Sequence, residues 1–200
     1  CDVLTMSATP IPRTMMLSFF GDMDISVLKE KPKYRKDIIT LIKPENKFND
    51  IIPLIKKQIK LNHQVFWICP LIEQSKKLNF VSAKIKFNDI NKLFPNNVGI
   101  IHGNMNAQER EIVLNLFLNK KIKILVSTTI IEVGINFPDA NIIIIEDSNK
   151  FGLSQLHQLR GRVGRGSSVS YCILMYKKNL SQNAKKRLKI LRETNNGFII

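Results

Sequence analysis

Several features that mark other classes of protein are scarce or missing in this sequence of 200 residues. Its three cysteines, Cys1, Cys69 and Cys172, are far apart and include no CxxC pair. A disulfide framework and a zinc ribbon are therefore excluded, and a reducing compartment is favoured. No apolar run approaches the roughly 18 residues of a membrane-spanning helix and no signal peptide opens the chain, so we expect no membrane partner. Internal repeats and low-complexity segments are also absent.

Acidic residues are few as well, because 16 Asp and Glu stand against 31 Lys and Arg, a formal net charge of +15. A positive balance of this size favours a polyanionic partner, most often nucleic acid. The alternative is compositional, since Lys, Asn and Ile are abundant throughout the chain. Hydrophobic residues make up 44% of the sequence, enough for a sizeable core, which makes disorder a poor interpretation.

Short apolar runs alternate with amphipathic segments along the chain. Apolar residues at intervals of three and four mark the helical segments, and Asn106 with Glu109 resembles a capping box. Strands of near-continuous Val, Ile and Leu between such helices predict an α/β fold with a mostly parallel sheet and helices on both faces. The predicted strands are 2–6, 38–43, 64–69, 98–101, 122–127, 142–145 and 169–176. The predicted buried stripes are Phe48, Ile51, Ile52, Ile55 and Ile59, then Ala83, Phe87, Ile90 and Phe94, then Ile112, Val113, Leu116 and Phe117.

Two segments differ from this α/β body. Residues 21–34 are polar and lack clear periodicity, so we interpret them as a linker after the first 20 residues. Residues 177–192 hold seven basic side chains and no acid, and Ser181 is expected to cap a helix there. The buried face of that helix would hold Ala184, Leu188 and Leu191. Another face would turn three basic side chains toward either DNA or water, namely Lys185, Lys189 and Arg192.

The stretch most indicative of chemistry is QLHQLRGRVGRG, residues 155–166. Arg162 and Arg165 are three apart, so at a helical start they would project to one side. Glycines at 161, 164 and 166 let the backbone approach a partner closely. Arginine suits phosphate because its planar guanidinium donates two parallel hydrogen bonds and stays protonated. The alternative is a solvated basic turn beside the sheet.

Two further stretches place polar residues directly after predicted strands. Thr128 and Thr129 follow strand 122–127, and His102 with Gly103 follows strand 98–101. Open α/β sheets bind ligands at the carboxyl ends of their strands, where hydroxyl and N–H groups can hold phosphate. The alternatives are ordinary helix capping by threonine and a structural histidine.

The run IIIIED, residues 142–147, mimics the Mg²⁺-binding strand of an ATPase with a phosphate-binding loop. The matching GxxxxGK[ST] loop is absent, since no glycine of the chain is followed by lysine. We therefore interpret Glu146 and Asp147 as strand-end polar residues. The three histidines lack metal-ligand spacing, and we predict no metal site.

Taken in order, four segments are similar to motifs III to VI of superfamily-2 helicases: SATPIPRT (7–14), His102–Gly103, TTIIEVGIN (128–136) and QLHQLRGRVGR (155–165). With CPLIEQS (69–75) and FGLSQLHQLRGRVGRG (151–166), the chain resembles the RecG family of branched-DNA helicases. The resemblance covers essentially the whole chain. Each motif is moderately specific, and the set in this order is very specific.

The resemblance implies a division of the chain. Residues 1–20 would be the tail of the first RecA-like lobe, 21–34 the linker and 35–176 the second RecA-like lobe. Residues 177–200 would be the truncated start of a basic helical hairpin, the translocation motif. Because the chain begins with Cys rather than Met, we expect a piece of a longer protein, with the phosphate-binding loop and acidic box upstream of Cys1.

The resemblance also implies roles for single residues. Arg162 and Arg165 match catalytic arginines that reach across the lobe interface to ATP, and Gln158 stands where other members have histidine. Gly134 and Asn136 match nucleotide-binding positions, although many members carry Asp at the latter. The residues implied in DNA contact, or in coupling it to nucleotide state, are Ser7, Thr9, His102, Gly103, Thr128, Thr129, Lys185, Lys189 and Arg192.

The implied function is an ATP-dependent DNA helicase that remodels forks and Holliday junctions in recombination and repair, cytoplasmic, nucleoid-associated and of bacterial type. ATP and Mg²⁺ would be held mainly by the first lobe, and the partners would be branched or duplex DNA, that lobe and an upstream wedge domain. Two alternatives stay open: the motor of a transcription-repair coupling factor, and a passive basic module that binds nucleic acid without nucleotide. A DEAD-box RNA helicase lobe is disfavoured, because QLRGRVGR replaces the usual HRxGRxGR.

Overall fold

A computed structural model describes Ser26 and residues 36–70, 76–128, 137, 139–177 and 179–195, with side chains of 76–80 excluded. The predicted strand 2–6 and nearly all of the predicted linker 21–34 lie outside these residues. Five of the predicted site residues also lie outside them: Ser7, Thr9, Thr129, Gly134 and Asn136.

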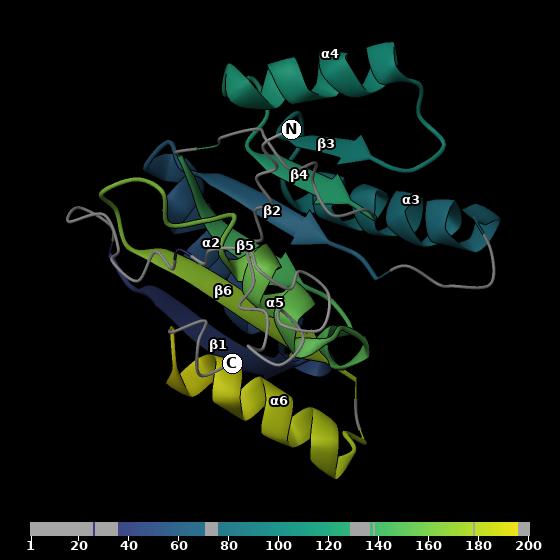
Figure 1. Cartoon of the computed structure of the whole chain (residues 1–200). Helices are drawn as coiled ribbons and strands as arrows, with labels where there is room; N and C mark the ends of the chain where they lie inside the picture. The colour runs from purple at the N-terminus through teal and green to yellow at the C-terminus, as the bar shows by residue number, and fades with distance from the viewer. Residues whose placement is uncertain are drawn as a thin grey trace, which may run out of the picture.

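The described chain forms one six-stranded sheet whose neighbouring strands all run parallel, in the order β1-β6-β5-β2-β4-β3 (Figure 1). This confirms the α/β prediction, and the six predicted strands within the described residues are all present. The strands are β1 (Ile38–Pro44), β2 (Gln64–Ile68), β3 (Val98–Ile101), β4 (Ile124–Ser127), β5 (Ala140–Ile145) and β6 (Ser170–Tyr176).

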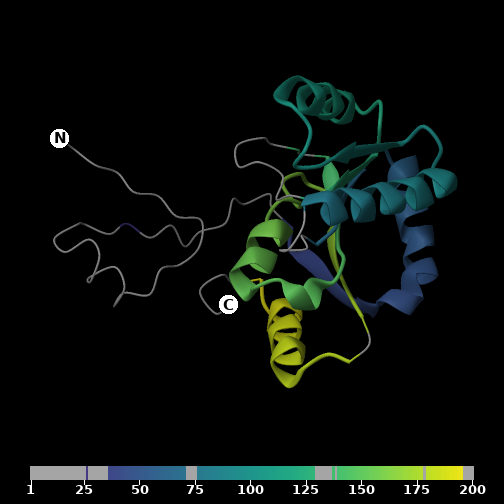
Figure 2. The same cartoon turned by 90° about the vertical axis from the view of Figure 1, so that its right-hand side faces the viewer.

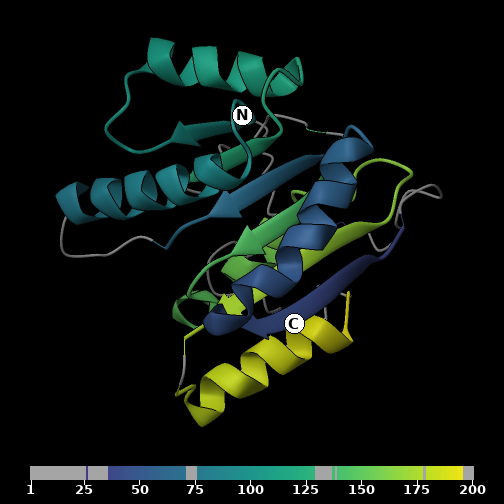
Figure 3. The same cartoon turned by 180° about the vertical axis from the view of Figure 1, so that it is seen from behind.

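Helices cover both faces of the sheet, as Figures 2 and 3 show from the side and from behind. One face packs against α4 (Ala107–Leu118), α5 (Leu153–Arg160) and α6 (Gln182–Glu193), and the other against α2 (Ile52–Lys60) and α3 (Lys76–Leu93). Two short 3-10 helices, η1 (Glu45–Ile51) and η2 (Ser148–Lys150), follow β1 and β5. All six residues of β5 are buried, because a central strand covered on both faces has no solvent side.

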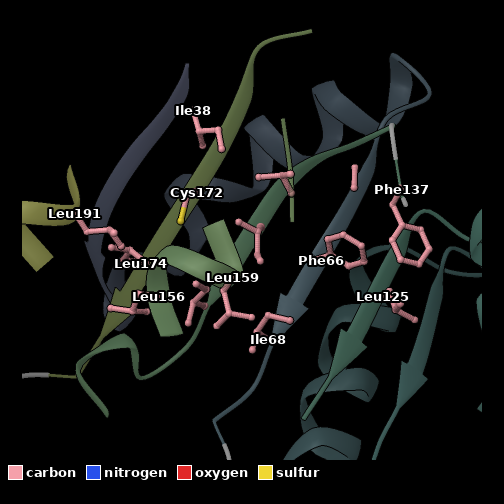
Figure 4. Packing of buried hydrophobic residues seen from close by; sticks show 14 of the residues in the cluster. Ile38, Phe66, Ile68, Leu125, Phe137, Leu156, Leu159, Cys172, Leu174 and Leu191 are labelled. Carbon is pink, nitrogen blue, oxygen red and sulfur yellow. The ribbon is translucent and has the colours of Figure 1, made fainter. Parts of the chain in front are cut away.

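The core on the α4, α5 and α6 face joins strand residues to one stripe of each helix. Phe66 packs against Phe117 and Phe137 with ring centroids 5.3 and 5.2 Å apart. Leu156 and Leu159 of α5 and Leu191 of α6 fill the rest of the space beside Cys172 and Leu174 (Figure 4). Helices α5 and α6 are therefore parts of the same packed unit as the sheet.

Helix α4 begins with the predicted capping box, since Asn106 Oδ1 accepts from Glu109 N–H at 2.8 Å and Glu109 Oε2 accepts from Asn106 N–H at 3.0 Å. The prediction that its stripe of four apolar residues is buried is only partly confirmed. Phe117 is fully buried, but Ile112 and Leu116 are 62% and 40% exposed. The helix packs on β3, the edge strand of the sheet, so only one side of its wide apolar face has a surface to cover.

Helix α6 agrees with the sequence in cap and in faces. Ser181 Oγ accepts from Ala184 N–H at 3.2 Å. The predicted apolar side is buried: Ala184, Leu188 and Leu191. The predicted basic side is exposed: Lys185, Lys189 and Arg192.

Candidate functional site

The arginine pair lies in a turn that follows α5. The helix ends at Arg160, where Gly161 N–H donates to His157 O at 3.0 Å. The expectation of a helical start for Arg162 and Arg165 is therefore wrong, because the glycine-rich sequence after Arg160 closes the helix instead of opening one. The two arginines project from irregular backbone between α5 and β6.

Gly164 holds this turn close to the sheet. Its φ is +74°, a left-handed conformation that side chains rarely adopt. A Cβ at this position would lie 2.9 Å from Ile38 Cγ1 and 3.6 Å from Ser170 Cβ. Since Ile38 and Ser170 are the first residues of β1 and β6, the arginine turn sits at the edge where these parallel strands begin.

The two guanidinium groups are close enough to affect each other. Arg162 is half-buried and Arg165 is exposed. Burial lowers the pKa of Arg162, and the positive charge of Arg165 lowers it further. Both side chains can only donate hydrogen bonds, so the pair suits an anion with several acceptor oxygens, such as phosphate, and does not suit a metal ion. Gln158, half-buried on the last turn of α5, lies one turn before Arg162.

A second group of predicted residues meets at the opposite edge of the sheet. The β3–β4 register pairs Ile101 with Ser127, so His102 and Thr128 follow neighbouring strand ends. Thr128 is buried, and its N–H donates to Ile101 O at 3.3 Å. Burial lowers the pKa of His102, which keeps its ring neutral near pH 7. A Cβ at Gly103 would meet no atom within 4 Å, so the backbone there faces open space.

The structure thus brings His102, Gly103 and Thr128 together, and it brings Arg162 and Arg165 together, but at different edges of the sheet. Residues 129–136, which follow Thr128 in the chain, lie outside the described residues.

Sequence reasoning missed two arginines that join α5 to α6. Arg160 is 2% exposed, and its Nη1 donates to Leu191 O at 2.6 Å and to Thr194 O at 2.8 Å. Arg160 Nη2 also lies 3.1 Å from His157 Nδ1. The signal that could have found it is helical spacing, since Arg160 falls four residues after Leu156 on the buried side of α5.

Arg187 makes the reciprocal connection from α6. Its Nη1 donates to Phe151 O and its Nη2 to Asn149 O, both at 3.1 Å, just ahead of α5. Arg160 of α5 therefore contacts carbonyl groups at the end of α6, and Arg187 of α6 contacts carbonyl groups just before α5. The guanidinium fork can satisfy two carbonyls at once, which holds the two helices in one arrangement.

The two acids at the end of β5 are engaged by lysines. Glu146 Oε1 lies 2.7 Å from Lys86 Nζ of α3, and Asp147 Oδ2 lies 2.9 Å from Lys150 Nζ and 3.2 Å from Lys177 Nζ. Within the described part of the chain, no group of three His, Cys, Asp or Glu side chains could hold a metal ion. No helix among the described residues is long and apolar enough to cross a membrane.

A six-stranded parallel sheet with helices on both faces places the chain in the α/β class, and the comparisons identify it as a RecA-like helicase lobe. The family model described as "Helicase conserved C-terminal domain" matches residues 46–167, and the chain belongs to that family. The solved structure of RecG bound to a three-way DNA junction is similar, with 38% identity and a TM-score of 0.80 over 96% of this chain and 25% of that one. The yeast DEAD-box splicing factor Prp28, with a TM-score of 0.68 at 17% identity, shares the fold.

The curated relatives named ATP-dependent DNA helicase RecG include proteins of Bacillus subtilis and Thermotoga maritima. That of Bacillus subtilis is 46% identical over 98% of this chain and 29% of its own length. That of Thermotoga maritima is 42% identical over 100% of this chain and 26% of its own length. The chain therefore spans less than a third of the length of the relatives it matches.

Proposed function

We propose that this chain is the second motor lobe of an ATP-dependent DNA helicase that acts on branched DNA in recombination and repair. The observation that carries the proposal is the similarity to RecG over essentially the whole chain, including the RecG–junction structure. In this assignment residues 1–20 end the first lobe, 21–34 link the lobes, 35–176 form the second lobe and 177–200 begin the basic hairpin. The partners are branched or duplex DNA, the first lobe and a wedge domain of the same polypeptide, in the bacterial cytoplasm.

The arginine turn is the part of this lobe assigned to the nucleotide. Arg162 and Arg165 would contact the phosphates of ATP from across the lobe interface, and Gln158 would orient them or the attacked phosphate. Gly134 and Asn136 are assigned to the same nucleotide. ATP supplies the hydrolysable phosphate, and an arginine placed beside its transferred group is worth about 10³–10⁵ in rate. Since the pair offers donors alone, Mg²⁺ is assigned to the first lobe.

Contacts with DNA are assigned to two surfaces. The first is the carboxyl edge of the sheet at His102, Gly103 and Thr128. From the resemblance alone, Ser7, Thr9 and Thr129, which lie outside the described residues, are also assigned to DNA contact or to its coupling with nucleotide state. The second is the exposed basic side of α6: Lys185, Lys189 and Arg192. Backbone N–H, hydroxyl and ammonium groups bind phosphates without reading bases, so binding is expected to tolerate any sequence and to weaken steeply with salt.

The reciprocal Arg160 and Arg187 contacts support mechanical coupling between the arginine turn and α6. Arg160 lies two residues before Arg162, and its guanidinium donates to the last turn of α6. A shift of the arginine turn on lobe closure would therefore be passed to the basic helix instead of being absorbed in a loop.

The test is ATP hydrolysis by the polypeptide that includes the first lobe, with and without forked DNA. We expect forked DNA to stimulate the wild type strongly, and Arg165→Ala to lower stimulated turnover by about 10³-fold or more while DNA affinity changes less than about twofold. Lys47→Ala, an exposed basic side chain after β1, is the matched control. ATP hydrolysis that is not stimulated by DNA, or that is unchanged in Arg165→Ala, would contradict the role assigned to the arginine turn and favour the passive binding module.

A further inference from the structure

The edge of the sheet where β2 and β4 begin brings two lysine-bearing turns side by side. One turn leads from α2 into β2, and the other leads from α4 into β4; in Figures 1 and 3 the ends of both helices lie at this edge. Val65 N–H donates to Lys123 O at 2.8 Å, and Lys123 Nζ donates to Asn62 Oδ1 at 2.5 Å. The two turns are therefore fixed relative to each other.

Six lysines, called here the amino-edge lysines, lie on the second half of α2 and on the turn after α4: Lys56, Lys57, Lys60, Lys120, Lys121 and Lys123. Asp139 Oδ2 pairs with Lys120 Nζ at 2.7 Å, and its charge also acts on Lys123. Four are exposed and form no ion pair with any described acid: Lys56, Lys57, Lys60 and Lys121. The pKa of Lys123 is lowered by burial and by the charge of Lys120, in keeping with crowding of like charges.

Three of these lysines share one exposed face of α2. Lys56, Lys57 and Lys60 lie there around a shallow, open depression together with Pro53 and Leu61. Leu61 is 56% exposed. Ammonium groups on long, flexible stems can follow a chain of phosphates, and the exposed side chain of Leu61 can contact sugars.

We propose that the amino-edge lysines bind the phosphate backbone of a second duplex arm of the DNA. The proposal rests on the proposed function, because only a branched DNA substrate has a second arm in addition to the one that the motor holds. The site differs from the arginine turn, which packs on the first residues of β1 and β6, whereas the lysines surround the beginnings of β2 and β4. It also differs from His102, Gly103 and Thr128, which lie at the opposite edge.

The first test compares salt dependence in the whole protein. Lys60→Gln with Lys121→Gln removes one charge from the end of α2 and one from the turn after α4. Lys43→Gln with Lys47→Gln removes two charges from the carboxyl end of β1 and from η1 and serves as the control. Affinity for a three-way junction is measured against salt, with a linear duplex in parallel. We expect the slope of log K against log[salt] for the junction to fall by about 1.8 in the lysine-edge variant and by less than about 0.5 in the control.

The second test locates the arm by photo-crosslinking from position 60, with benzoylphenylalanine in place of Lys60. We expect crosslinks to a junction arm, lost when that arm is shortened. An unchanged slope, an equal fall in both variants, or crosslinks only to protein would overturn the proposal, the last indicating an acidic protein surface as the occupant. The proposed helicase function is tested separately by fork-stimulated ATP hydrolysis in the wild type. A loss of that stimulation would contradict the helicase function, whereas the salt slopes and crosslinks test only the lysine site.

Discussion

The two described cysteines are structural side chains and not nucleophiles. Cys172 is fully buried in β6, and burial raises the pKa of its thiol to about 12. Burial also raises the pKa of Cys69, and the nearby carboxylate of Glu146 adds to the shift. Since the thiolate is the reactive form, both side chains behave as small apolar groups at neutral pH.

The raised pKa of Cys172 predicts a loss of stability at alkaline pH. The thiol ionises near pH 9 in the unfolded chain but only near pH 12 in the folded one, so the unfolded state is favoured as pH rises between these values. Between pH 9.5 and 10.5 the free energy of unfolding should fall by about 1 kcal/mol more in the wild type than in Cys172→Ala. Urea titrations at both pH values measure this difference. Equal falls in the free energy of unfolding of the two proteins would contradict a raised pKa of Cys172.

At the scale of elements, the contact between α5 and α6 depends on polar as well as apolar groups. Both helices contribute leucines to one core, namely Leu156, Leu159, Leu188 and Leu191. Arg160 lies beside this core and donates a hydrogen bond to Leu191 O near the C-terminus of α6. The last carbonyls of a helix lack partners within it, so the guanidinium of Arg160 acts as a C-terminal cap supplied by another helix.

Replacing Arg160 should therefore destabilise α6 specifically. Arg160→Met retains the unbranched stem of the side chain but removes the guanidinium, which leaves Leu191 O and Thr194 O without their donor. We expect the free energy of unfolding to fall by about 2–4 kcal/mol, and α6 amides to exchange faster than those of the central strands.

Arg192→Met, on the exposed side of the same helix, is the control and should cost less than about 0.5 kcal/mol. Equal losses in the two variants, or uniform exchange across the molecule, would show that Arg160 does not cap α6.

At the scale of the whole molecule, the sheet could be predicted from the sequence because its strands are short, continuous apolar runs such as Ile142–Ile145. The faces of α6 were equally predictable, since its apolar and basic residues separate cleanly at helical spacing. The exposure of Ile112 could not be predicted, because it depends on the sheet ending at β3. Nor could the place of Arg162 and Arg165, which follows from a turn that packs Gly164 on Ile38.

Positive charge is concentrated on the exposed side of α6. Lys189 and Arg192 lie 3.8 and 3.9 Å from Glu193, and all three side chains are more than half exposed, so this acid offsets their charge only weakly. Replacing Lys185, Lys189 and Arg192 by Gln in the whole protein should lower the salt slope of duplex binding by about 2–3 and weaken DNA-stimulated hydrolysis.

A variant with Lys185→Arg and Lys189→Arg retains the charge and should retain the slope, because phosphate attraction depends on charge more than on the form of the cation. If the conservative variant lost the slope as well, the shape of the side chains and not their charge would be responsible. If the Gln variant kept the slope, α6 would face water in the working complex, and its link through Arg160 would hold the lobe together without transmitting motion to DNA.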